Sequence, residues 1–158
     1  MLLSVKAGLR AGEIAKLTWD MVLDPAGEIG DVVELRDCAA KKKSGRLIPI
    51  NPTLRAALAA WREVTTGTGP IIVSERGSAM RPVSIVNWFA AAYREVRLDG
   101  CSSHSGRRTF ITSAAKKIVE AGGSLRDVQE LAGHTSLATT QRYIQGDSAA
   151  KRNVVKLI

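Results

Sequence analysis

Apolar residues recur with helical spacing along most of the chain, and this pattern predicts its principal elements. Pro52 is typical of a first helical turn, and Ser124 and Gly133 are typical of the two ends of a helix. Thr135 or Ser136 would cap the last helix. The predicted helices cover residues 10–18, 52–64, 83–97, 104–121, 125–132 and 137–144.

Strand-like patterns are fewer and shorter. Val32, Val33 and Leu35 form one such run, and residues 46–50 are typical of the returning strand of a hairpin. Pro49 indicates an edge position or the end of that strand. Residues 71–73 predict another short strand. The fold class that follows is α+β, mostly helical with a small antiparallel sheet.

Composition favours a globular protein that binds a polyanion. The 158 residues are 45% apolar, which is ordinary for one domain with a core. Lysine and arginine exceed aspartate and glutamate by 23 to 15, which gives a net charge of +8. Such an excess favours nucleic acid, because neutralising phosphates releases counterions. A merely solvated cationic surface is the alternative.

The sequence gives little support for a metal site, a disulfide or a membrane span. Cys38 and Cys101 lack CxxC spacing, and only two histidines accompany them, so we expect no zinc site. A single disulfide remains open. The apolar stretch over residues 1–7 is too short for a signal peptide, and no apolar run approaches 18 residues. We therefore expect a cytoplasmic protein with no membrane contact.

A series of residues suited to phosphate chemistry runs through most of the chain. Arginine, lysine and histidine side chains can bind and protonate phosphate oxygens, and a tyrosine hydroxyl is a usable nucleophile. The chain's two histidines both fall inside this series. In order, its members are Arg10, Lys41, His104, Arg107, His134 and Tyr143.

Three members of the series, Arg10, His134 and Tyr143, also have an ordinary structural explanation. Arg10 and Glu13 share a helix face, where an exposed ion pair contributes little. His134 and Tyr143 could be a turn histidine and a half-buried core tyrosine. About eight helical residues would separate them by roughly 10 Å along the axis. Tyr93 lies on an apolar helical stripe and is interpreted as a core residue.

Taken together, the residues resemble the catalytic motifs of the tyrosine recombinases, the phage integrase family. Residues 8–17, GLRAGEIAKL, are similar to the first conserved box, and residues 104–110, HSGRRTF, to the second. Residues 131–143, with His134 in Gly-His-Thr and a terminal tyrosine, are similar to the third. The resemblance implies a catalytic domain over residues 1–158. It also implies that the first helices and the N-terminal core-binding domain are missing.

The resemblance implies a role for each residue. Arg10, oriented by Glu13, and Arg107 would bind the scissile phosphate. His104 would act as general base, and His134 would donate to the transition state. Tyr143 would be the nucleophile that forms a 3′-phosphotyrosyl intermediate, with no metal, cofactor or ATP.

The resemblance implies that the general acid is a lysine on the loop of a hairpin, which would protonate the departing 5′ oxygen. Counting back from Pro49 in the Lys…Arg-x-x-Pro pattern favours Lys41, with Arg46 in the arginine slot. Lys42 and Lys43 remain alternatives.

The implied partners are double-stranded DNA and further copies of the chain, assembled as a tetramer on paired sites. Charge and loop position add Lys42, Lys43, Arg76, Arg81 and Arg108 as candidate DNA contacts. The alternatives to a site-specific recombinase are a catalytically silent DNA-binding fragment and a type IB topoisomerase.

Overall fold

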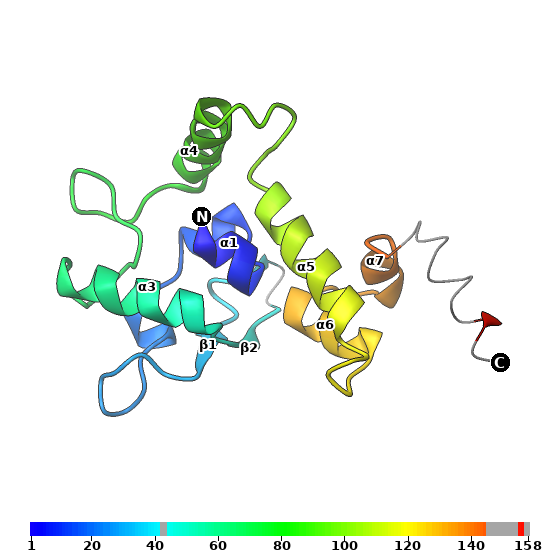
Figure 1. The fold of residues 1–158 in the computed structure, drawn as a ribbon. Coiled ribbons are helices and arrows are strands. Elements are labelled where there is room, and N and C mark those ends of the chain that lie inside the picture. Colours follow the sequence, from blue (N-terminus) through cyan, green and yellow to red (C-terminus); the bar gives the residue numbers. More distant parts are fainter. Residues whose placement is uncertain (42–43, 145–154, 157–158) are drawn as a thin grey trace. The chain divides into compact units, whose positions relative to one another are not determined.

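The computed structural model describes residues 1–41, 44–144 and 155–156. The chain divides into two compact units, residues 1–110 and 111–158, with the boundary inside one helix. The described part is mostly helical with one two-stranded sheet, so the predicted α+β class is confirmed (Figure 1). In chain order the elements are α1 (Leu2–Ala7), α2 (Ala11–Ile14), the 3-10 helix η1 (Trp19–Met21), β1 (Val32–Leu35), β2 (Arg46–Pro49), α3 (Pro52–Glu63), α4 (Pro82–Glu95), α5 (Ser105–Lys117), α6 (Leu125–Ala132) and α7 (Leu137–Gln141).

The predicted hairpin is present in the first unit (Figure 1). Strands β1 and β2 pair antiparallel, with Val33 opposite Ile48 and Leu35 opposite Arg46. Val33, Leu35 and Ile48 are buried, so the alternating apolar residues of both strands face the core. Pro49 ends β2, as its missing N–H donor predicts.

Helices α3 and α4 form where the pattern predicts them. The Asn51 side chain caps α3 by accepting a hydrogen bond from the Thr53 N–H at 3.0 Å, and Pro52 occupies the first turn. Leu54 and Leu58 are buried. In α4, Tyr93 is buried as expected, together with Ile85 and Phe89, whereas Val86 is exposed.

The start of the chain differs from its prediction. The helix predicted over residues 10–18 is limited to α2, and an additional short helix, α1, precedes it. Helix α1 packs against α2 and α3, and α2 packs against α4. These helices are too short to be stable alone, so they depend on this packing.

The strand predicted over residues 71–73 is wrong. Backbone pairing there is limited to isolated bridges, which join Thr18 to Pro70 and Val73 to Ala79. The Ile71 N–H donates to the Leu17 carbonyl at 3.0 Å, and the Trp19 N–H donates to the Gly69 carbonyl at 2.9 Å. A ladder does not continue, because the partner segment enters η1 at Trp19.

The second unit contains the rest of α5, which ends at Lys117 rather than at the predicted residue 121, followed by α6 and α7. Asp127 accepts a hydrogen bond from the Ser124 N–H at 2.7 Å, and Gly133 ends α6 in the left-handed conformation. Helix α7 packs against α6 (Figure 1). Ser136 is its N-cap, and it ends at Gln141, earlier than predicted. No helix within the described ranges is long and apolar enough to cross a membrane.

Gly8 connects α1 to α2 in a conformation that few other residues adopt. Its φ is +65°, and a Cβ there would lie 2.5 Å from Phe110 Cδ1. We expect Gly8→Ala to lower the free energy of unfolding by about 2 kcal/mol or more, through strain and overpacking. Urea denaturation measures this change.

The matched control is Gly12→Ala. Gly12 lies inside α2, and a Cβ there would meet no heavy atom within 4 Å. Alanine should therefore leave stability unchanged or raise it by less than about 1 kcal/mol. Equal effects at the two positions would contradict this account of the connection.

Candidate active site

A buried carboxylate at the start of α2 organises the predicted phosphate-binding residues of the first unit. Arg10 is the N-cap of α2 and Glu13 its third residue. Glu13 Oε2 accepts a hydrogen bond from the Arg10 N–H at 2.9 Å, and Oε1 accepts one from Arg10 Nη1 at 2.6 Å. The Glu13 side chain is 1% exposed and that of Arg10 is 21% exposed. The carboxylate thus fixes both the backbone and the guanidinium of Arg10, of which the sequence predicted only the contact with the guanidinium.

A second arginine binds the same carboxylate. Arg46, the first residue of β2, donates from Nη1 to Glu13 Oε1 at 3.2 Å and from Nη2 to Oε2 at 3.1 Å. This bidentate pair joins the hairpin to the start of α2 across 33 residues of sequence. Two guanidinium groups on one carboxylate leave an excess of positive charge.

The two arginines keep Glu13 ionised. Burial alone would raise the pKa of this carboxyl group, but the hydrogen bonds and charges of Arg46 and Arg10 outweigh burial and lower it below its ordinary value of 4.5. Glu13 therefore remains an anion near neutral pH. The orientation of Arg10 does not change with pH in that range.

A cavity of about 420 Å³ opens beside Arg10. Three members of the predicted series border it: Arg10, Lys41 and His104. Lys41 and His104 are both exposed. Lys42 and Lys43, the alternative general acids, lie outside the described residues. Among the residues that the structure describes, the lining comprises Arg10, Ala11, Gly12, Glu13, Lys16, Ala39, Ala40, Lys41, Pro82, Val86, Ser103 and His104.

Arg107 lies in the first turn of α5 and is 3% exposed. Its Nη1 donates to the Gly8 carbonyl at 2.5 Å. This hydrogen bond holds the Arg107 side chain against Gly8, which precedes Arg10 by two residues in the sequence. The preceding residue, Gly106, allows α5 to lie close to α1, because a Cβ there would lie 2.8 Å from Ser4 Oγ. Arg108, the next residue, is exposed.

His134 and Tyr143 are brought together in the second unit. Their rings stack with centroids 5.7 Å apart and an interplanar angle of 21°. The predicted separation of roughly 10 Å assumed continuous helix. Instead, α7 ends at Gln141, and the Tyr143 N–H donates to the Thr140 carbonyl at 3.0 Å in a tighter turn. His134 Nδ1 lies 3.0 Å from Thr140 Oγ1.

The tyrosines differ in surroundings. Tyr93 is 8% exposed, and burial raises the pKa of its hydroxyl group. Its ring stacks on Phe89 at 6.1 Å, which agrees with its interpretation as a core residue. Tyr143 is half-buried and follows α7 directly. Of the two, Tyr143 is the better placed to reach a substrate.

The remaining predicted DNA contacts lie on the surface. Arg76, Arg81 and Arg108 are exposed, and none forms an ion pair with the residues that the structure describes. Within the same ranges, no group of three or more histidine, cysteine, aspartate or glutamate residues could hold a metal ion. Cys38 and Cys101 are free thiols.

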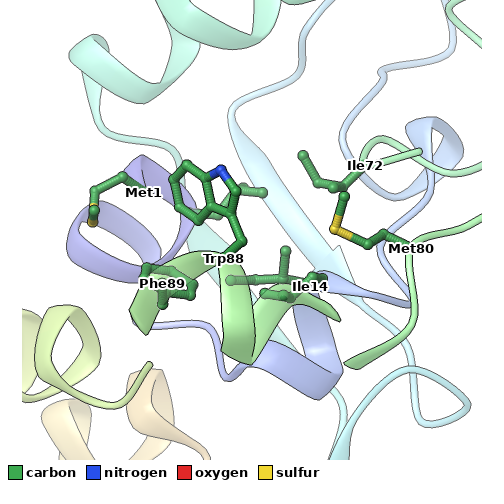
Figure 2. Close-up of a pocket in the computed structure, with 8 residues that line it drawn as sticks. Met1, Ile14, Ile72, Met80, Trp88 and Phe89 are labelled. Carbon is green, nitrogen blue, oxygen red and sulfur yellow. The ribbon is translucent and has the colours of Figure 1, made fainter. Parts of the chain in front are cut away.

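A second cavity, of about 160 Å³, is lined by apolar side chains. Figure 2 shows its labelled side chains, all apolar, gathered around Trp88. Among the described residues, its lining includes no carboxylate, histidine, lysine, arginine, tyrosine or cysteine side chain, so it is not a candidate for catalysis. Its lining comprises Met1, Leu3, Ile14, Ile72, Met80, Ile85, Trp88 and Phe89.

Sequence reasoning missed two contacts that position predicted residues. It used Arg46 only as a marker of register, and the Arg-x-x-Pro pattern carries no sign of the bond to Glu13. It placed Thr140 inside the third box without a role. Both contacts depend on tertiary structure, which spacing along one element does not reveal.

The chain is similar to known proteins along most of its length. Residues 1–149 match the profile of the phage integrase family. The chain is 32% identical over 149 residues to the tyrosine recombinase XerC of Methylobacterium nodulans, and 32% identical over 147 residues to that of Rhizobium meliloti. Each alignment covers 90% of this chain but only 43% of the relative.

Solved structures share the fold. The XerA recombinase superposes with a TM-score of 0.75 at 22% identity, covering 98% of this chain and 55% of that one. The Tn1549 transposon integrase in complex with a circular intermediate DNA gives 0.74 at 20% identity, covering 99% and 57%. A lambda integrase dimer bound to a COC′ core site gives 0.68 at 22% identity, covering 92% and 50%.

The Glu13 cluster predicts a pH-dependent stability. Because the folded pKa of Glu13 lies below 4.5, its ionised form contributes stability above that pH, and this contribution is lost as pH falls through the folded pKa. At neutral pH, Glu13→Gln should lower the free energy of unfolding by about 3 kcal/mol, because it removes the carboxylate that binds the buried side chain of Arg46. Urea denaturation from pH 7 downwards should show the deficit shrinking below pH 4.5.

Glu95→Gln is the matched control. Glu95 is an exposed residue at the end of α4 and forms no ion pair with the described residues. Its substitution should change stability by less than about 0.5 kcal/mol at any pH. A Glu13→Gln deficit that stays constant with pH would contradict the assigned ionisation of Glu13.

Proposed function

The chain belongs to the phage integrase family, and on that basis we propose that it carries the catalytic centre of a site-specific tyrosine recombinase. Such an enzyme cuts a DNA strand and joins the end to another strand. The observation that carries the proposal is the cavity where Arg10, held by Glu13, meets Lys41 and His104. An arginine, a lysine and an imidazole at one cavity suit a phosphodiester and its departing oxygen.

The first chemical step is attack by Tyr143. Its phenolic oxygen forms a bond to the scissile phosphorus as the proton passes to His104. The bond from phosphorus to the 5′ oxygen breaks, and that oxygen takes a proton from Lys41. The product is a 3′-phosphotyrosyl link and a free 5′ hydroxyl. Because the phosphodiester energy is kept in the link, a second hydroxyl can reverse the step without ATP.

The arginines neutralise the negative charge that develops on the phosphate in the transition state. Arg10 and Arg107 bind its non-bridging oxygens, and His134 donates a further hydrogen bond. Fixed donors of this kind need no reorganisation when the transition state forms. Glu13 supports the arrangement, because its hydrogen bonds hold Arg10 in one orientation at the cavity.

The partner of the reaction is double-stranded DNA. The net charge of +8 and the exposed side chains of Arg76, Arg81 and Arg108 suit contacts with a phosphate backbone. Solved relatives in complex with DNA support this partner. We extend the proposal to a tetramer on paired DNA sites, the arrangement in which strands from two duplexes can be exchanged.

Covalent trapping tests the proposed nucleophile. The protein would be incubated, in EDTA, with a pool of nicked duplexes whose sequence around the nick is randomised. The nick allows the departing fragment to diffuse away, so the phosphotyrosyl link accumulates. We expect a protein–DNA adduct that survives denaturation, and its complete loss in Tyr143→Phe.

Tyr93→Phe is the matched control, because it removes the hydroxyl group of a buried tyrosine in α4. It should leave adduct formation within about twofold of the unsubstituted protein. An adduct that persists in Tyr143→Phe would show that another residue is the nucleophile. The absence of any adduct across the pool would contradict the proposed activity of this chain.

A further inference from the structure

The hydroxyl group of Thr140 lies against the imidazole of His134. Thr140 is fully buried in α7, and its Oγ1 lies 3.0 Å from His134 Nδ1. A buried hydroxyl without a hydrogen bond costs about 1–3 kcal/mol, so this contact is a strong constraint on both groups. It also occupies one of the two nitrogens of the ring.

Other contacts hold the ring and its backbone in place. The His134 N–H donates to the Gln129 carbonyl at 3.1 Å, and Gln129 Nε2 donates to the His134 carbonyl at 2.9 Å. The Tyr143 ring stacks on the imidazole. With the backbone fixed and a ring face covered, the Thr140 hydroxyl is one of the contacts that set how the imidazole is turned.

The direction of the Thr140 bond decides which nitrogen carries the proton. A neutral imidazole has one N–H and one bare nitrogen, and a hydroxyl group can rotate to serve either. When the hydroxyl donates to Nδ1, the proton must reside on Nε2. The nitrogen opposite Thr140 is then a hydrogen-bond donor.

We propose that Thr140 is a positioning residue, which donates to His134 Nδ1 and thereby keeps the proton on Nε2. That tautomer is the one His134 needs to donate to a phosphate oxygen. The choice of this tautomer rests on the proposed function, in which His134 is a donor, whereas its measurement by NMR does not depend on catalysis. Thr140 acts only through His134 and touches no reacting atom.

The chain provides a matched control in the adjacent threonine. Thr139 lies in the same helix and is half-buried, and its side chain forms no hydrogen bond with the described residues. Thr139→Val and Thr140→Val remove the same hydroxyl group and keep the same branched shape. Thr140→Ser keeps the hydroxyl group and removes only a methyl.

Nitrogen NMR of the full chain reads the tautomer directly. The chain has two histidines, so a ¹⁵N-labelled sample gives two imidazole patterns, and His104→Gln assigns them. The spectra would be recorded at a pH where both rings are neutral. A merely structural role for Thr140 would leave the position of the His134 proton unchanged.

The expected result is a His134 ring protonated at Nε2 in the unsubstituted chain, in Thr139→Val and in Thr140→Ser. In Thr140→Val, the two tautomers should become mixed. A proton on Nδ1 in the unsubstituted chain would overturn the proposal without any variant. An unchanged Nε2–H population in folded Thr140→Val would overturn it as well.

Adduct formation then measures the consequence. Thr140→Val should slow the trapping reaction by about twofold or more relative to Thr139→Val, because only the fraction of His134 that keeps its proton on Nε2 can donate. Thr140→Ser should restore most of the rate. A mixed tautomer with an unchanged rate would overturn the positioning role. No adduct from the unsubstituted chain would count against the proposed function, while the NMR result would still decide the tautomer.

Discussion

The arrangement of the first unit depends on one buried carboxylate. Glu13 is almost fully enclosed, and burying its charge is favourable only because Arg10 and Arg46 both bind it. Those bonds join the start of α2 to the hairpin that leads from the Lys41 segment. The cluster of Glu13, Arg10 and Arg46 therefore stabilises the fold and also forms part of the candidate phosphate site. A substitution in this cluster changes both.

Local signals made much of the fold predictable. The hairpin, α3, α4 and α6 follow alternating or helical apolar patterns with recognisable caps, as at Asn51 and Gly133. Helix α1 was not predicted, because its few residues depend on packing against α2 and α3. The strand at residues 71–73 was wrong for a related reason. Its β-branched residues favour extended backbone, but no partner strand continues beside them.

The candidate site shows the same division between local and long-range information. The bond between Arg10 and Glu13 follows from a spacing of three residues, so the sequence predicted it. Arg46 comes from 33 residues away, and nothing in its own segment indicates the contact. The stacking of His134 and Tyr143 depends on where α7 ends, which is the least predictable property of a short helix.

The central claim is that Arg10, fixed by Glu13, neutralises charge on a non-bridging phosphate oxygen. The most direct test is to trap adducts with nicked DNA whose scissile phosphate is replaced by a methylphosphonate, which lacks one charged oxygen. Arg10→Ala should be severely slowed on ordinary DNA and largely restored on the methylphosphonate, whereas Lys41→Ala, which affects the departing oxygen, should not be restored. Equal impairment of Arg10→Ala on both substrates would contradict the claim.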